Sequence, residues 1–221
     1  MLKRLFSHIA LLIALLATAV ACSSNDEPTE ERRYDFVTYL GYAQGMARWQ
    51  YIGPGDSEPL DMLALMPEPE KIKPGQRVLL SYSVPDAAHR ITVYGITYAN
   101  VASDSLRVNV KPVDQYPKHP IKLGALWRTG DYINLRCEVE YTTKTRALYM
   151  MADRATLDAD TIDVHLIHDL MAADSTYFWR ACYGSFYVGR AFDRTHCKAI
   201  RVHLNDVTYP KKSTYVFGKT K

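Results

Sequence analysis

The chain has 221 residues, of which nearly half are hydrophobic, and its formal net charge is +3. This length suits one large or two small domains that each bury a core. Two of the cations, Lys3 and Arg4, lie in a leader that we expect to be removed, which leaves 200 residues with a net charge of about +1. So small a charge gives no reason to expect nucleic acid or acidic substrates as partners.

The amino terminus has the pattern of a secretory signal. A short basic head precedes an apolar run from Ile9 to Val20. The run is shorter than the ~20 residues that a membrane-spanning helix needs. We therefore interpret residues 1–21 as a signal peptide.

The end of this leader resembles the lipobox of bacterial lipoproteins. Thr18 to Cys22 places small residues directly before a cysteine, although Ala19 stands where the lipobox prefers Leu. The resemblance implies cleavage between Ala21 and Cys22 and a lipid on the Cys22 sulfur. Several buried acyl chains would anchor the protein without a spanning segment. The alternative is an ordinary signal peptide that is cleaved after Ala21.

Residues 22–33 are predicted to form a flexible tether, because they are polar and acidic and contain a proline. Their start resembles the serine-plus-acid signal that directs lipoproteins of the Bacteroidetes type to the cell surface. The alternatives are a plain solvated tether and a periplasm-facing anchor. The residues of this export signal are Ser23, Ser24, Asn25, Asp26 and Glu27.

Residues 34–111 contain short runs rich in Tyr, Val, Ile and Thr, which favour β-strands. The turns at 53–56 and 73–76 carry Gly and Pro, and Gly95 within a strand suggests a sharp corner. Such spacing is typical of a small closed barrel. The expected strands are Tyr34–Tyr42, Met46–Ile52, Leu60–Met66, Arg77–Val84, His89–Tyr98 and Ser105–Val110.

Residues 112–120 are rich in proline and read as a linker to a second domain at 121–221. From Tyr132 to Tyr141 apolar and polar residues alternate, as in a strand with one buried face. Further short strands predict an antiparallel β-sandwich. They are Leu123–Trp127, Ala147–Met151, Thr161–His168, Tyr177–Val188, Cys197–Leu204 and Thr214–Gly218.

The segment from Ala125 to Tyr141 resembles the NigD-like lipoproteins, which carry a tryptophan, a turn, Gly-Asp-Tyr and an alternating strand at this place. The matching residues are Trp127, Gly130, Asp131, Tyr132, Asn134 and Leu135. The resemblance implies an all-β chain, with an OB-like barrel followed by a β-sandwich. It implies no reaction and no catalytic residues.

Catalytic and metal-binding patterns are weak. His165 and His168 are three residues apart, so on one strand they point to opposite faces and cannot share an ion. Cys197 next to His196 is not a nucleophile and base for the same reason. We predict no enzymatic activity, no metal and no cofactor.

Three thiols remain after the lipid-bearing cysteine is set aside, namely Cys137, Cys182 and Cys197. An odd number leaves at least one thiol unpaired in an exported protein. Cys182 and Cys197 are expected to flank a hairpin at unequal distances from its turn. Whether they pair is left open, and buried thiols are the favoured alternative.

Two groups of aromatic residues are candidate binding surfaces. Trp49 and Tyr51 share one side of a strand in the first domain, unless they fill its core. In the second domain Phe178, Cys182, Phe186 and Val188 look like core, and the opposite face carries the other group, unless a neighbouring segment covers it. That group is Tyr177, Trp179, Tyr183 and Tyr187.

These observations predict a lipid-anchored protein of the outer membrane that is exposed at the cell surface and acts by binding or assembly. The expected partners are a glycan or an envelope protein, with the membrane held through the lipid. One alternative is a structural or accessory subunit with no small-molecule ligand. A further alternative is an envelope hydrolase that uses carboxylates.

Overall fold

The structure is a computed structural model that describes residues 31–56, 58–98, 106–140, 147–171 and 178–219. The predicted signal peptide, Cys22 and the export signal at 23–27 lie outside these ranges. Residues from Arg32 to Lys221 form one compact unit. Within the described part of the chain, no helix is long and apolar enough to cross a membrane.

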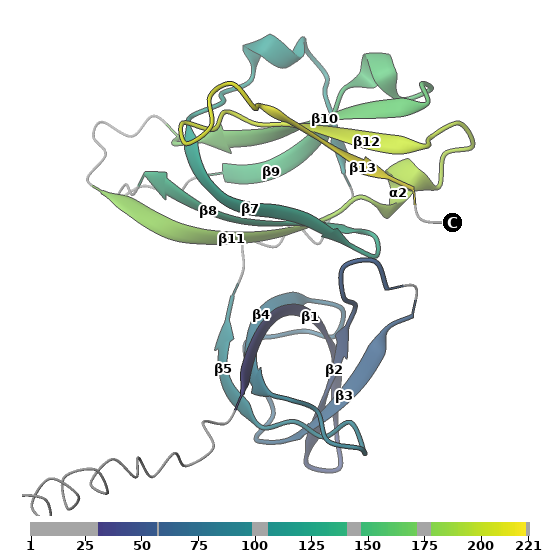
Figure 1. Cartoon of the computed structure of the whole chain (residues 1–221), viewed down its shortest axis with the longest axis vertical. Coiled ribbons are helices and arrows are strands. Elements are labelled where there is room, and N and C mark those ends of the chain that lie inside the picture. Colours follow the sequence, from purple (N-terminus) through teal and green to yellow (C-terminus); the bar gives the residue numbers. More distant parts are fainter. Residues whose placement is uncertain (1–30, 57, 99–105, 141–146, 172–177, 220–221) are drawn as a thin grey trace, which may run out of the picture. The chain divides into compact units, whose positions relative to one another are not determined.

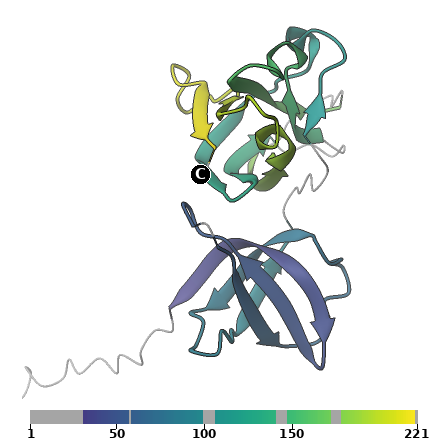
Figure 2. The ribbon, with the colours of Figure 1, turned by 90° about the vertical axis from the view of Figure 1, so that its right-hand side faces the viewer.

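The first sheet has five antiparallel strands in the order β3-β2-β1-β4-β5, and it curls around its own core (Figure 1 and Figure 2). Gly41, with φ of +127°, lies at a break in the β1–β2 register, where its left-handed backbone bends β1. The strands are β1 (Arg32–Ala43), β2 (Met46–Tyr51), β3 (Leu60–Leu65), β4 (Arg77–Ser83) and β5 (Val93–Thr97).

The predicted barrel is not closed. Among the residues that the structure describes, β3 and β5 share no ladder, and an isolated parallel bridge between Leu63 and Arg90 joins this side. The expected strand from His89 begins later, at Val93, because the Asp86 carboxylate accepts the Arg90 N–H at 2.8 Å and holds a turn there. This turn lies where β5 would have to pair with β3 to close the barrel. The strand order therefore resembles that of a barrel, but the sheet stays open.

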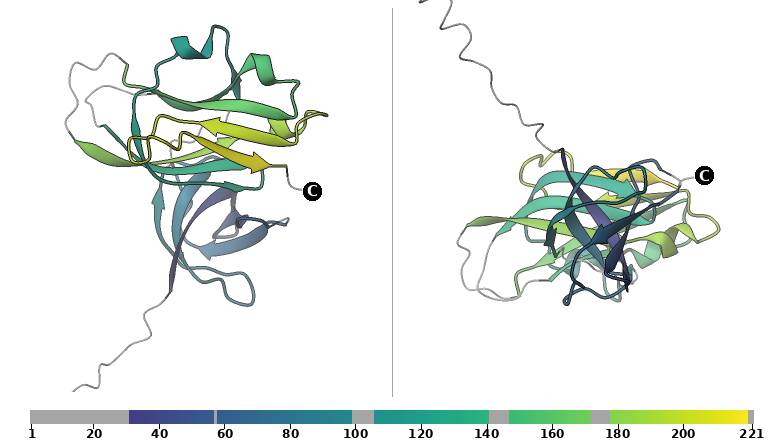
Figure 3. Two further views of the ribbon diagram at one scale, coloured as in Figure 1. Left: turned by 45° about the horizontal axis from the view of Figure 1, so that its top comes forward. Right: turned by 90° about the horizontal axis from the view of Figure 1, so that it is seen from below.

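The second part of the chain contains two sheets that enclose one core (Figure 1 and Figure 3). One sheet has the order β13-β12-β10-β9-β6 and the other β11-β8-β7. The strands are β6 (Arg107–Val108), β7 (Ile121–Thr129), β8 (Tyr132–Glu140), β9 (Ala147–Ala152), β10 (Thr161–Asp169), β11 (Trp179–Tyr187), β12 (Ala199–His203) and β13 (Thr214–Gly218). The short helices are η1 (Val113–Gln115), η2 (Arg154–Thr156) and α2 (Gly189–Phe192).

The all-β prediction is confirmed, but the sandwich is not wholly antiparallel. β10 pairs with β12 in parallel, because the strand between them in sequence, β11, lies in the other sheet. β6 pairs in parallel with β9, so the predicted strand at Ser105–Val110 adds to the sandwich instead of the first sheet. A domain boundary at residues 112–120 stays a prediction.

The cysteines Cys137, Cys182 and Cys197 are all buried, and no disulfide joins them in the structure. Cys182 lies on β11, whereas Cys197 precedes β12 in the opposite sheet. The expected hairpin that the two would flank is therefore wrong, because the chain changes sheets between them.

A buried arginine links the first sheet to the β7-β8-β11 sheet. Arg77 is 3% exposed, and its Nε donates to Ser185 Oγ at 2.8 Å. Its Nη2 donates to Phe36 O at 3.3 Å and to Thr129 Oγ1 at 3.5 Å, and its guanidinium lies 4.1 Å from the Tyr132 ring centroid. Burial lowers the pKa of Arg77 to about 10, so the side chain remains charged at neutral pH.

Three of the residues that carry the family resemblance, Trp127, Tyr132 and Asn134, lie at this junction. Ser185 Oγ donates to Asn134 Oδ1 at 2.8 Å, and Asn134 Nδ2 donates to Thr129 Oγ1 at 2.8 Å. The Trp127 ring packs against Phe36 with centroids 5.8 Å apart. The hairpin pattern therefore has a structural explanation, which is contact with the first sheet.

We predict that Arg77→Met lowers the free energy of unfolding by about 1–3 kcal/mol, because it removes the buried, charged donor to Ser185 Oγ and Phe36 O. Chemical denaturation would measure the change. Arg48→Met is the matched control, since the Arg48–Asp61 ion pair is half exposed and should contribute little. Equal losses in the two variants would contradict a special role for Arg77.

Candidate functional site

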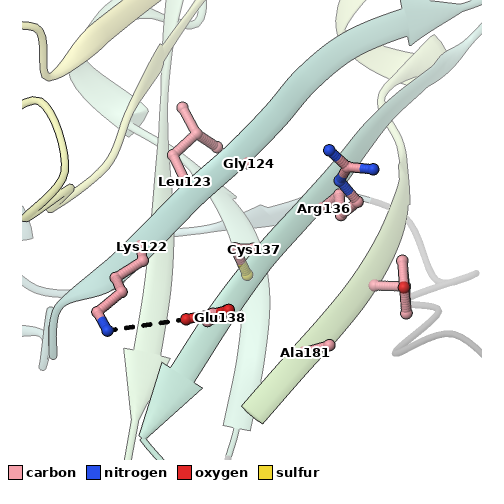
Figure 4. A pocket seen from close by; sticks show the side chains of 8 residues that line it. Lys122, Leu123, Gly124, Arg136, Cys137, Glu138 and Ala181 are labelled. Atoms are coloured by element: carbon pink, nitrogen blue, oxygen red, sulfur yellow. Dashed lines mark ion pairs between the residues drawn. The ribbon is translucent and has the colours of Figure 1, made fainter. Parts of the chain in front are cut away.

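A groove of about 450 Å³ lies on the outward face of the β7-β8-β11 sheet (Figure 4). Residues from all three strands line it, so it depends on their pairing. The lining residues are Lys122, Leu123, Gly124, Arg136, Cys137, Glu138, Ala181 and Tyr183.

The strand register explains why these side chains meet. Arg136 lies opposite Tyr183 on β11 and Ala125 on β7, and Glu138 lies opposite Ala181 and Lys122. Since successive residues of a strand face opposite ways, these side chains point outward while their neighbours fill the core.

Gly124 keeps the floor of the groove open. It lies at a register shift in β7, between Leu123 and Ala125. A Cβ at this position would come within 3.1 Å of Arg136 O and 3.2 Å of Arg136 Nε. The missing side chain therefore lets Arg136 extend across β7.

The charged side chains of the groove differ in their contacts. Lys122 Nζ lies 3.7 Å from Glu138 Oε2 and 4.3 Å from the ring centroid of Trp179, so one cation contacts both a carboxylate and an aromatic face. Figure 4 shows the Lys122–Glu138 pair as a dashed line. Among the described residues, no ion pair engages Arg136. The groove thus offers one available cation beside aromatic surface.

The structure places the predicted aromatic residues of β11 as follows. Trp179, Tyr183 and Tyr187 are half-buried, whereas Cys182, Phe186 and Val188 are buried in the core. Tyr187 packs edge-on against Tyr132 at 5.4 Å, away from the groove lining. Phe178, which we expected in the core, is 57% exposed. Tyr177 lies outside the described residues.

The aromatic pair of the first sheet does not form a binding surface as predicted. Trp49 is 0% exposed and packs against Tyr39 with ring centroids 5.0 Å apart. Tyr51 is half-buried against the same core. The alternative that Trp49 fills the core is therefore correct, and the prediction of a surface role for it is wrong.

A second pocket, of about 490 Å³, lies beside the β7–β8 turn. Its cations are held by backbone carbonyls, because Arg128 donates to Gly130 O and Gly218 O, and Lys219 donates to Phe192 O. Three aspartates also line it. The lining residues are Gln50, Ile52, Asp56, Arg128, Gly130, Asp131, Tyr132, Tyr187, Phe192, Asp193 and Lys219.

A pair of histidines meets in a way that the sequence did not reveal. His165 on β10 and His203 on β12 stack with centroids 4.5 Å apart, because the parallel register sets them opposite each other. Asp163 Oδ1 lies 2.6 Å from His203 Nε2 and accepts from Arg201 Nη1 at 3.1 Å. His168 is buried. No group of three or more metal-ligating side chains was found in the described ranges.

The surroundings of His165 disfavour its charged form. Burial, followed by the neighbouring His203 and Lys118, lowers the pKa of His165 to about 4, against the opposing effect of Asp153 and Asp163. The imidazole is therefore neutral in the folded protein at pH values where an exposed histidine is charged.

Comparison with known proteins gives a fold and no closer relationship. No protein-family model and no curated protein sequence matches the chain. A solved NigD-like immunity protein from Bacteroides caccae matches with a TM-score of 0.58 and 18% identity, over 85% of this chain and 92% of that one. The chain has the fold of a NigD-like protein.

Two further solved structures share the NigD-like fold. A protein of unknown function DUF1344 from Bacteroides vulgatus matches with a TM-score of 0.61 and 17% identity, over 86% of this chain and 92% of that one. A candidate lipoprotein from Bacteroides fragilis matches with a TM-score of 0.55 and 10% identity, over 86% and 96%. The resemblance predicted from the β7–β8 hairpin is thus confirmed at the level of the fold.

We predict that Trp49→Ala lowers the free energy of unfolding by about 3–5 kcal/mol, because it leaves a cavity in the first core. Trp179→Ala should cost less than about 1 kcal/mol, since its ring is half-buried on the outward face. Urea denaturation would compare the two. A large loss for Trp179→Ala would show that its ring is structural.

Acid should destabilise the protein through His165. Between about pH 6.5 and 4 the unfolded chain binds a proton at this residue that the folded chain does not, so stability falls as the pH falls. Because the ring is partly exposed, we expect a loss of roughly 1–2 kcal/mol between pH 7.5 and 4.5 that His165→Asn removes. His89→Asn, at an exposed histidine, is the control and should leave the loss unchanged.

Proposed function

We propose that the chain is an exported, lipid-anchored envelope protein that acts by binding a partner protein and not by catalysis. The lipobox-like segment ending at Cys22 supports the anchor. The shared fold with a candidate lipoprotein supports an envelope location, and none of the proteins compared above carries an enzyme's name. We place the anchor in the outer membrane with the folded part at the cell surface.

The groove on the β7-β8-β11 sheet is the proposed binding surface. The observation that carries this proposal is the set of Arg136, Tyr183 and Trp179 on one outward face, beside the Gly124 floor. Arginine, tyrosine and tryptophan are the residues most enriched in protein interfaces, where they contribute most of the binding free energy. The open floor would let a partner side chain reach the Arg136 guanidinium.

A protein partner fits this surface better than a glycan. The Lys122 ammonium covers one face of the Trp179 ring, and that face is then closed to a stacking sugar. The neighbour from Bacteroides caccae is named an immunity protein. We propose that this chain binds a protein of the envelope or one released by a competing cell.

The proposal can be tested by site-specific photo-crosslinking of the lipidated full-length chain in intact cells. A photoreactive amino acid at Ala181, inside the groove, should give a discrete adduct with a second protein. The same probe at Val216, which is 62% exposed on β13, is the matched control and should give none. Adducts at both positions, or at neither, would contradict the proposed surface.

Arg136→Glu should abolish the adduct at Ala181 by reversing the charge of the groove. For the identified partner, Arg136→Ala should weaken binding by roughly tenfold or more, as for other central arginines of interfaces. The alternative of a glycan ligand is tested by measuring the melting temperature of the wild-type chain with a panel of glycans. A shift that Arg136→Ala removes would identify a glycan ligand and overturn the protein-partner proposal.

A further inference from the structure

Two buried cysteines face each other beneath the groove. Cys137 on β8 and Cys182 on β11 occupy directly opposed positions in the antiparallel ladder. They are 3% and 2% exposed and belong to the same core cluster, so both side chains point to the inner face of the sheet. Opposed residues of such a ladder have Cα atoms about 4.5–5.5 Å apart, within the range of about 4.4–6.8 Å that a disulfide spans.

We propose that Cys137 and Cys182 form a cross-strand disulfide in the exported protein. The inference rests on the proposed envelope location, since such bonds persist in oxidising compartments. Cys197 is the thiol left over. It precedes β12 in the opposite sheet, and its Sγ donates to Ala199 O at 3.4 Å. The pairing thus differs from the Cys182–Cys197 pair considered from the sequence.

The oxidant is a disulfide donor, either a protein disulfide oxidase or oxidised glutathione. One thiolate attacks a donor sulfur, which breaks the donor S–S bond and forms a mixed disulfide with release of one donor thiol. The second thiolate then attacks the protein sulfur of that bond, and the other donor thiol leaves. Two protons and two electrons pass from the cysteines to the donor. Because both sulfurs are buried, the exchange takes place during folding, before the core closes.

The bond would fix the register of the two strands that carry the groove. Arg136 and Glu138 flank Cys137 on β8, and Ala181 and Tyr183 flank Cys182 on β11. A covalent link between the inner faces prevents β11 from sliding along β8. It therefore holds the outward side chains of the groove in their observed pairing.

The test uses the chain from Ser23 to Lys221, which lacks Cys22, refolded with oxidised and reduced glutathione or with a phosphine reductant. Peptide mapping without reduction should find a Cys137–Cys182 linkage and a mass about 2 Da below that of the reduced chain. The oxidised form should melt roughly 5–15 °C higher than the reduced form. This is the shift expected when a disulfide closes the loop from Cys137 to Cys182 in a protein of this size.

Cysteine variants test which two of the three cysteines form the disulfide. Cys197→Ala should keep the linkage, whereas Cys137→Ala and Cys182→Ala should each lose it and melt at the same temperature with and without oxidant. A linkage that includes Cys197, or no linkage after oxidative refolding of the wild-type chain, would overturn the proposal.

Peptide mapping of the protein isolated from cell envelopes distinguishes a failure of this proposal from a failure of the proposed function. No linkage after refolding would reject the disulfide and leave the binding proposal intact. A linkage after refolding that is missing from the cell-derived protein would support the pairing and count against export.

Discussion

Arg77 is the residue on which the arrangement of the chain from Arg32 onward most depends. It begins β4 in the first sheet, and its guanidinium is buried against side chains of the other sheet. A charge in such surroundings is costly unless hydrogen bonds replace its hydration. Ser185, Thr129 and Phe36 supply those bonds, and the ring of Tyr132 covers one face of the guanidinium.

The same contact explains where the groove lies. The outward face of the β7-β8-β11 sheet is covered near Ser185 and Asn134, where the first sheet contributes Arg77. Two residues further along each strand the face carries Arg136 and Tyr183, and there it is open. One sheet therefore serves as a structural surface at one end and as the candidate binding surface at the other.

The change of sheets between β10, β11 and β12 has consequences for both faces. It makes β10 and β12 parallel neighbours, which stacks His165 on His203. It also pairs β11 with β8, which sets Cys182 opposite Cys137. Neither pair is visible as a spacing in the sequence, because the residues of each pair are separated by about 40 positions or more. Long-range register, and not local pattern, creates both sites.

Local alternation determined much of this protein. The alternation from Tyr132 to Glu140 was sufficient to assign the inward and outward residues of β8, although Asn134 on the outward face is buried. The hairpin with Trp127 was sufficient to suggest the NigD-like fold. Alternation has a period of two and is set by the chain itself, so it can be read without knowing any partner strand. The tertiary structure alone decided which strands pair. It buried Trp49, left the first sheet open beside Asp86, and opposed the two cysteines, because each of these depends on contacts between segments far apart in the chain.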